Sequence, residues 1–358
     1  MQLRLESGLM RTANCFSPDY FSARDRFREL ATKAGARITT LPLTAKGPAG
    51  ESLGIDIAWL GPEHPRRVLL HSSGLHGVEG FAGSAIQLQL LQTPPFLTPG
   101  LAIVIVHILN PYGMTWLRRV NENNVDLNRN FRSDQTYRGA PPAYASLDSF
   151  LNPPTPPSAD LYFARAVYLV LRHGMTALKQ SVVGGQYDFP RGLFFGGDRM
   201  EEGPRKYASF VAERIAVAEK TVVIDVHTGL GKFGHDLLLV DSQDYARMQA
   251  LGGHRVTALQ PDQGGAYRVE GGLESMIFRA FSKNRPVFIG QEFGTYGPIT
   301  VLHALREENR WHHYGSGTLD HPTKRRLKET FCPNVESWRE TVLRRGGELI
   351  EAALVELA

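Results

Sequence analysis

The sequence predicts an α/β protein with a mixed, mostly parallel central sheet flanked by helices on both faces. Short runs rich in β-branched residues alternate with longer segments of helical spacing, which is the order expected of strands joined by crossover helices. The short runs are apolar throughout, as in strands that are buried on both faces. The chain has 358 residues, of which 42% are hydrophobic, so it is long enough to bury a substantial core. We expect one catalytic domain that spans residues 1–358.

The strands of this sheet are predicted from short apolar runs. These runs are Val68–Leu70, Leu101–Val106, Val222–Ile224, Leu237–Val240 and Val287–Ile289. A further segment, Ile55–Trp59, follows a stretch rich in glycine and proline and is predicted to be an edge strand or a hairpin arm. Segments with apolar residues at helical spacing lie around these runs. The predicted helices are Phe21–Ala34, Gly80–Gln92, Ala159–His173, Pro204–Ala218, Gly272–Ser282 and Asn334–Leu357.

Two segments depart from this alternation. Six prolines lie between residues 139 and 158. Because proline is excluded from helix interiors and central strands, we expect a long surface loop at about 139–158, within the single domain. The charged stretch Leu305–Lys328 contains His312, His313 and His321. We expect it to be a solvated surface, in preference to a second metal site.

Composition and charge exclude several classes of protein. The net charge of +4 is spread over 76 charged groups, which is too weak a field to indicate nucleic-acid binding. The longest uninterrupted apolar run, Leu101–Val106, is far too short to span a membrane. The charged N-terminus does not resemble a signal peptide. The cysteines, Cys15 and Cys332, are too few for a disulfide scaffold, so we expect a reducing, cytoplasmic environment.

Polar residues follow the predicted strands at four places. These clusters are His71–Glu79, Asn110–Gly113, Asp225–Thr228 and Glu292–Tyr296. In an open α/β sheet, ligands bind in the crevice beyond the carboxyl ends of the strands. We therefore expect the four clusters to converge on one site, and this pattern indicates an enzyme.

The first cluster contains a His-x-x-Glu pair, His76 and Glu79. With 12 histidines and 36 acidic residues in the chain, about one His-x-x-Asp/Glu match is expected by chance, so a loop histidine and a helix-capping glutamate remain possible. The alternative is a pair of zinc ligands on a tight turn, which needs a third protein ligand. His227, at the end of a predicted strand, is the best candidate, although a buried structural histidine is the other interpretation. Asp225 lies on the same strand face and could orient the imidazole of His227.

The remaining strand-end histidines are interpreted differently. His71 and His107 also end predicted strands. We expect both to be buried in the core or to lie behind the site.

The stretch from Asn110 to Phe131 is rich in asparagine and arginine. It can be interpreted as an elaborate surface turn, because asparagine satisfies its own backbone in turns. It can also be the polar wall of a pocket, in which Arg129 holds a carboxylate through two hydrogen bonds and Asn128 adds a third. Arg119 is a second cation nearby. Beside a zinc ion, these residues would suit an anionic substrate with a polarised carbonyl.

Taken together, these residues resemble the zinc carboxypeptidase family, in particular its small bacterial members that trim cell-wall peptides. The family pattern is His-x-x-Glu, an Asn-Pro-x-Gly turn, an Arg before Gly-Val-Asp-Leu-Asn-Arg-Asn, a distant His and a Glu. The matching elements here are His76 and Glu79, Asn110–Gly113, Arg119 with Val125–Asn130, His227, and Glu292. The segments Cys15–Arg24 and Asp225–Gly231 look like an uncharacterised, mainly bacterial branch of the family. The family usually has glycine before the Val-Asp-Leu-Asn-Arg motif; Asn124 stands there in this chain and can also adopt positive φ.

The resemblance implies a role for each matching residue. His76, Glu79 and His227 would bind one zinc ion per chain. Glu292 would be the general base that activates water, and Arg119 would stabilise the oxyanion.

Further roles are implied around the substrate. Asn128 and Arg129 would hold a substrate carboxylate, and Asp126 would accept a hydrogen bond from the zinc ligand His76. A tyrosine covers the substrate in the family; Tyr267 is the best match by distance, with Tyr296 as its rival.

The sequence thus supports a zinc-dependent hydrolase that cleaves a C-terminal peptide or peptide-like amide bond. A deacylase similar to succinylglutamate desuccinylase and aspartoacylase is the alternative enzyme, and its substrate would be an N-acyl amino acid. Both substrates carry a free carboxylate. A catalytically silent zinc- or peptide-binding module is a third possibility, although binding alone does not need the base Glu292. No nucleic-acid or membrane partner is expected.

Overall fold

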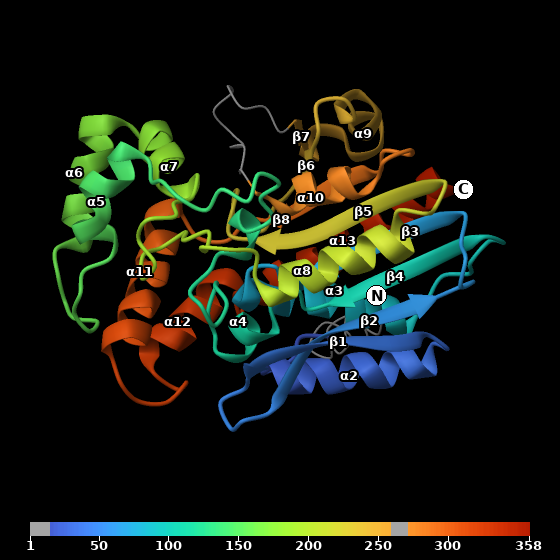
Figure 1. Cartoon of the computed structure of the whole chain (residues 1–358), viewed down its shortest axis with the longest axis horizontal. Helices are drawn as coiled ribbons and strands as arrows, with labels where there is room; N and C mark the ends of the chain where they lie inside the picture. The colour runs from blue at the N-terminus through green and yellow to red at the C-terminus, as the bar shows by residue number, and fades with distance from the viewer. Residues whose placement is uncertain (1–14, 259–270) are drawn as a thin grey trace.

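The computed structural model describes residues 15–258 and 271–358, and its centre is one mixed sheet of eight strands (Figure 1). The strand order is β1-β2-β4-β3-β5-β8-β6-β7. Strands β4, β3, β5 and β8 are parallel neighbours, whereas β1 and β2 on one side and β6 on the other pair antiparallel. The bounds are β1 (Arg37–Lys46), β2 (Ser52–Leu60), β3 (Arg67–Ser73), β4 (Leu101–His107), β5 (Lys220–Thr228), β6 (Asp236–Val240), β7 (Val256–Ala258) and β8 (Val287–Phe293).

Helices cover both faces of this sheet, so the predicted fold class is confirmed. On β3 and β5, Leu69 and Val222 pack into one core, while Leu70 and Val223 pack into the other. Helices α2 (Tyr20–Lys33), α3 (Gly80–Gln92) and α13 (Glu336–Leu357) cover the first face. Helices α8 (Glu202–Phe210) and α10 (Leu273–Ala280) cover the second. Burial on both faces explains why each central strand contains a continuous apolar run.

All of the apolar runs that were predicted as strands lie in strands. The segment Ile55–Trp59 is an arm of the β1–β2 hairpin, and the edge strand is its partner β1, which was not predicted. The side chains of β1 are exposed or half-buried along its whole length, and Pro42 lies at an irregularity in its pairing. An edge strand of this kind has no apolar run that could reveal it.

The surface loop predicted at about 139–158 is wrong in part, because helix α5 (Pro142–Leu151) lies within it. Pro141 and Pro142 occupy the N-cap and the first helical position, where a missing N–H costs nothing. Further helices that were not predicted are α4 (Pro111–Thr115), α7 (Met175–Val183), α9 (Tyr245–Gly252), α11 (Pro298–Tyr314) and α12 (Pro322–Phe331). Together with α6 (Tyr162–His173), helices α5, α7 and α11 lie beyond the carboxyl end of β5 (Figure 1).

The expectation of a solvated surface at Leu305–Lys328 is also wrong in part, because exposed residues such as 315–318 and 320 make up only part of this stretch. Residues 304 to 311 of α11 are all buried. Their charges are neutralised inside the protein: Glu308 lies 3.0 Å from Arg118 and 2.5 Å from Lys324. Arg306 and Arg310 share the carboxylates of Asp160 and Glu307. Charged residues are therefore internal here because each has partners of opposite charge.

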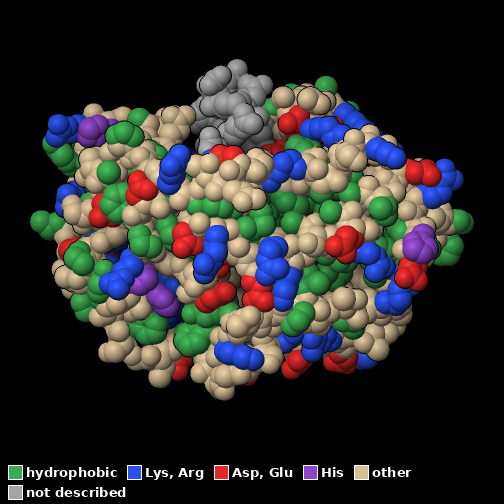
Figure 2. All heavy atoms as spheres, viewed as in Figure 1, with side chains coloured by type: hydrophobic (Ala, Val, Ile, Leu, Met, Phe, Trp, Pro, Cys, Tyr) green, Lys and Arg blue, Asp and Glu red, His purple; other side chains and the backbone are tan. Residues whose placement is uncertain are grey.

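The surface elsewhere carries mixed charge. On the face in Figure 2, Lys and Arg side chains alternate with Asp and Glu. Within the described ranges, no helix combines the length and apolarity that crossing a bilayer requires.

Replacing Glu308 with glutamine is expected to destabilise the fold, because Arg118 and Lys324 would remain buried without their anionic partner. The expected loss in the free energy of unfolding at pH 7 is about 3–5 kcal/mol. Burial lowers the pKa of Lys324 to about 8, although Glu308 raises it. Without Glu308, the pKa of Lys324 in the folded protein should fall further. At a pH between this value and the ordinary pKa of lysine, Lys324 is protonated in the unfolded chain but neutral in the folded protein. Part of the lost stability should then return as the pH rises from 7 to 9.

Urea denaturation at both pH values measures this effect. Glu340→Gln, at an exposed position of α13, is the matched control and should change stability by less than about 0.5 kcal/mol. A Glu308→Gln variant as stable as the wild type at pH 7 would contradict the account of this buried cluster.

Candidate metal centre

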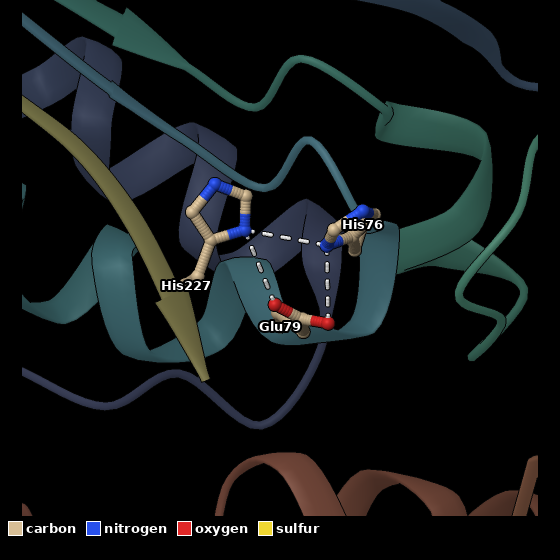
Figure 3. Close-up of side chains that lie close together, drawn as sticks. All are labelled: His76, Glu79 and His227. Atoms are coloured by element: carbon tan, nitrogen blue, oxygen red, sulfur yellow. Dashed lines mark hydrogen bonds and ion pairs between the residues drawn. The ribbon is translucent and has the colours of Figure 1, made fainter. Parts of the chain in front are cut away.

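Three side chains from two neighbouring strand ends converge at the carboxyl edge of the sheet (Figure 3). His76 and Glu79 belong to the turn after β3, and His227 is near the end of β5. His76 Nδ1 lies 3.2 Å from Glu79 Oε1 and 3.2 Å from His227 Nδ1, and His227 Nδ1 lies 3.6 Å from Glu79 Oε2. All three residues are buried. Within residues 15–258 and 271–358, they form the one group of three potential metal ligands.

The turn that carries His76 and Glu79 requires a glycine at position 77. Gly77 has a φ of 48°, and a Cβ atom there would lie 2.4 Å from the carbonyl oxygen of Arg118. The turn therefore packs backbone against backbone on the segment Asn110–Arg118, and Val78 N–H donates to that same oxygen (2.9 Å). The Asn110 side chain accepts a hydrogen bond from Gly113 N–H (2.8 Å) and shapes this supporting segment.

His227 is oriented by a carboxylate behind it. Its Nε2 lies 2.6 Å from Asp225 Oδ2, and the other oxygen of Asp225 accepts a hydrogen bond from Ser72 Oγ (2.6 Å). An ionised carboxylate can only accept, so Nε2 carries the proton and the lone pair of Nδ1 points at Glu79 and His76. This is the orientation that a metal-ligating imidazole requires.

His76 has the same arrangement on its outer side. Its Nε2 lies 3.2 Å from Asp126 Oδ1 and 2.9 Å from Arg119 Nη2. In the tautomer that donates to Asp126, the Nδ1 lone pair of His76 also points toward Glu79. Asp126 is itself held by Arg129, whose Nη1 lies 2.5 Å from Oδ2.

The Nδ1 atoms of His76 and His227 and the carboxylate oxygens of Glu79 are all acceptors, so their close approach favours a positive charge between them. Burial raises the pKa of Glu79, but His76, Arg119 and His227 lower it well below its usual range. Burial lowers the pKa of His227, but Asp225, Glu79 and Glu292 raise it well above its usual range. The site therefore holds an ionised carboxylate and binds a cation, either a proton or a metal ion, in preference to remaining neutral.

The ligand set and its spacing fit zinc. Two imidazoles and one carboxylate are a known set for catalytic zinc, which leaves one position open. Tetrahedral ligands at about 2.0–2.2 Å from an ion lie roughly 3.3 Å apart. The separations of 3.2, 3.2 and 3.6 Å agree with this value.

Glu292 lies next to this cluster on the adjacent strand. In the pairing of β5 with β8, Glu292 is directly opposite His227. Its Oε2 atom is buried, and no residue in the described part of the chain hydrogen-bonds to it. Burial and the charge of Glu79 raise the pKa of Glu292, although His227, His76 and Arg119 oppose the shift. A raised pKa and an unengaged oxygen are the properties that a proton-transferring carboxylate needs.

Arg119 also lies at the cluster. Its guanidinium donates to Glu79 Oε1 and lies 2.9 Å from His76 Nε2. The rings of Phe194 and Phe331 lie 5.9 and 6.0 Å from it and restrict its position.

Of the two residues expected to hold a substrate carboxylate, Asn128 lies on the cavity wall and Arg129 lies in the interior. Asn128 lines the cavity beside the cluster, and its Oδ1 accepts a hydrogen bond from Leu273 N–H (2.9 Å). Arg129 is fully buried, and its two Nη atoms bond to Asp126 and to the carbonyl oxygen of Val183 (2.5 Å each). In this conformation the structure makes Arg129 a support of Asp126.

Tyr267 and Tyr296 were the two candidates for the tyrosine that covers the substrate. Tyr267 lies outside the described residues. The hydroxyl of Tyr296 donates to Glu329 Oε1 (3.1 Å), and Tyr296 does not line the cavity.

The other sequence expectations near the site concern buried residues. Asn124 adopts a φ of 60°, as expected, and its amide bonds to the carbonyl oxygens of Pro190 and Gly192. His71 and His107 are buried in the core, as expected, and His107 stacks on Phe27 with ring centroids 4.4 Å apart.

A family model describing proteins of unknown function (DUF2817) matches residues 16–345. The chain belongs to the DUF2817 family. No curated protein sequence matches it.

Several solved structures are similar to this DUF2817 protein at low sequence identity. A carboxypeptidase A from Helicoverpa armigera is 14% identical, with 97% of this chain and 80% of that chain covered and a TM-score of 0.43. The murein-tripeptide amidase MpaA from Escherichia coli O157 is 17% identical, with 78% and 96% covered and a TM-score of 0.40. A succinylglutamate desuccinylase from Silicibacter sp. TM1040 is 16% identical, with 79% and 68% covered and a TM-score of 0.39.

The contributions of several residues at the site of this DUF2817 protein were not predicted from the sequence. Ser72 supports Asp225, and Thr228 N–H donates to Glu79 Oε2 (3.0 Å). Lys179 of α7 lines the cavity, where burial lowers its pKa and the charge of Glu292 raises it. Ser72 and Thr228 lie within the strand-end clusters His71–Glu79 and Asp225–Thr228, but the sequence indicated no particular role for either residue. Nothing in the sequence around Lys179 distinguishes it from a surface lysine.

The purified protein is expected to bind about one Zn²⁺ per chain. His76→Ala and His227→Ala should each lose nearly all of the metal, because two ligands hold zinc far more weakly than three. Elemental analysis after dialysis measures the content. His254→Ala, at an exposed histidine, should retain the wild-type amount. A His227→Ala variant with wild-type zinc content would show that the metal binds elsewhere.

Asp225→Asn tests the orientation of His227 separately from the ligands. The affinity for zinc is expected to fall by about 10–100-fold, since the carboxylate fixes the imidazole tautomer. Competition with a chromogenic chelator measures the affinity, and Asp198→Asn, an exposed aspartate, is the control. Equal affinities of Asp225→Asn and the wild type would contradict this role.

Proposed function

We propose that the protein is a zinc-dependent hydrolase that cleaves an amide bond next to a free carboxylate. The substrate is a C-terminal peptide bond or the amide of an N-acyl amino acid. The observation that carries the proposal is the position of Glu292, which faces the group His76, Glu79 and His227 from the neighbouring strand with one carboxylate oxygen unengaged within the described structure. A site that only bound zinc or a peptide would have no use for a base at this position.

When bound, zinc supplies a Lewis acid and a source of hydroxide near neutral pH. Glu292 accepts the proton of the attacking water and delivers it to the nitrogen of the leaving amine. Its raised pKa suits both steps, because the same group must take up and release a proton near the working pH. Asp225 and Asp126 keep His227 and His76 in the orientation in which their Nδ1 atoms face Glu79 and one another, where they would hold the ion.

Arg119 is proposed to stabilise the negative charge that develops on the carbonyl oxygen. It is a largely buried cation at the cluster, and the rings of Phe194 and Phe331 lie near its guanidinium.

Asn128 and Arg129 are proposed to hold the substrate carboxylate. Asn128 is already on the cavity wall. Arg129 has to exchange its bond to the carbonyl oxygen of Val183 for one to the substrate, since both of its Nη atoms have partners in this conformation.

The N-acyl amino acid substrate is favoured by the wall of the cavity. Most of the residues that line it are aliphatic or aromatic. The reaction in either case takes place within one catalytic domain, and the buried free thiols of Cys15 and Cys332 suit the reducing conditions of the cytoplasm.

Glu292→Gln is expected to lower kcat for amide hydrolysis by about 10²–10⁴-fold while zinc stays bound, because the amide cannot take up the proton. Product release from a peptide or N-acyl amino acid measures the rate, and elemental analysis measures the metal. Glu351→Gln, at an exposed position of α13, should behave as the wild type. Hydrolysis by Glu292→Gln at the full rate would rule out this residue as the base.

A further inference from the structure

A cavity of about 200 Å³ adjoins the metal centre, and His76, Glu79 and Glu292 form part of its wall. Most of the remaining lining residues belong to α5, α6, α7 and α11. An apolar cavity of about 150 Å³ is sufficient to bind benzene. The cavity therefore has room for a substantial part of a substrate and not only for the atoms that react.

Helices α6 and α7 make this wall apolar. Tyr162, Ala166 and Leu169 line the cavity from α6, and Leu178 and Val182 line it from α7. Spacings of three and four residues place each set on one side of its helix. The cavity wall is therefore a regular feature of both helices.

Polar side chains on the wall are concentrated at the metal centre. Away from the metal ligands and their neighbours, the lining residues include Tyr162, whose hydroxyl donates to the carbonyl oxygen of Ile299 (2.9 Å). Lys179 also lines the cavity, and its charge interacts with Glu292. Among the described lining residues, the cations are Arg119 and Lys179, and both act on groups of the metal centre.

This distribution decides which part of a substrate fits the apolar wall. A free carboxylate cannot be buried there without a cation, so the carboxylate must stay at the metal end. A peptide extension would bury N–H and C=O groups against aliphatic side chains, and each unpaired group is costly. A hydrocarbon chain has no polar groups and gains from burial along its whole length.

We propose that this cavity receives the acyl chain of the substrate, so that the protein hydrolyses N-acyl amino acids with a long hydrocarbon chain. The proposal rests on the proposed function and names its substrate class. Water adds its hydroxyl to the acyl carbon, the amide C–N bond breaks, and the amine nitrogen takes the remaining proton. The products are a fatty acid and a free amino acid.

The outer side of α6 fits such an amphiphilic substrate. Leu161 and Leu171 are 81% and 82% exposed, and Phe163 and Val167 are about half exposed. The helix thus presents apolar side chains both to the cavity and to its surroundings.

The test uses zinc-loaded protein and a series of N-acyl alanines with acetyl, hexanoyl, decanoyl and dodecanoyl groups, together with di- and tripeptides. We expect kcat/KM to rise roughly fourfold per added methylene until the cavity is full. Ala166→Phe fills part of the cavity and should lower the ratio of kcat/KM for the dodecanoyl and acetyl substrates by at least 10-fold. The matched control, Ala177→Phe, is exposed on α7 and should keep the wild-type ratio.

Calorimetric binding of dodecanoate, below its micelle concentration, gives a readout that does not depend on turnover. The wild type should bind dodecanoate but not acetate, and Ala166→Phe should weaken the binding. A kcat/KM that does not change with chain length, or peptides cleaved faster than the dodecanoyl substrate, would overturn the proposed substrate while leaving the hydrolase function in place. If nothing is hydrolysed, the proposed function fails, and absence of dodecanoate binding would then also overturn the acyl site.

Discussion

The site depends on the need to neutralise buried negative charge at the carboxyl edge of the sheet. Glu79, Asp126 and Asp225 are fully buried within contact of His76 and His227. Buried carboxylates remain ionised only where cations or hydrogen-bond donors compensate them. The two imidazoles link the carboxylates into one network, and their inner nitrogen atoms lie with Glu79 around a position that suits a divalent cation. The sheet supplies the frame, because β3 leads directly into the turn that holds His76 and Glu79, and its neighbour β5 carries Asp225 and His227.

A second part of the fold supplies the substrate environment. The sheet edge is polar, whereas the helices beyond it are apolar toward the cavity. The buried cluster of Glu308, Arg118 and Lys324 joins α11 and α12 to the turn that carries Arg119. The cavity wall and the proposed catalytic residues are therefore connected through ion pairs inside the protein, and neither part can shift freely without breaking them.

Much of this arrangement was predictable from two sequence patterns. Strands buried on both faces form continuous apolar runs, and the residues of the site follow these runs as polar clusters. The apolar runs predict the strands, and the polar clusters predict that His76, Glu79, His227 and Glu292 converge. Charge patterns were less informative. The sequence around Glu308 is typical of a surface helix, because its partner Arg118 is 190 positions away and the pairing cannot be recognised from the sequence. The position of Arg129 could not be predicted either, because its partner at Val183 is a backbone carbonyl that has no sequence signature.

The central claim is that two imidazoles and a carboxylate hold a zinc ion next to Glu292. A crystal structure of the zinc-treated protein, with anomalous data collected on both sides of the zinc absorption edge, tests it most directly. The account predicts one strong anomalous peak, bonded to His76, Glu79 and His227 with Glu292 beside it. A zinc peak at other residues, with the three side chains still in contact with one another, would contradict the account.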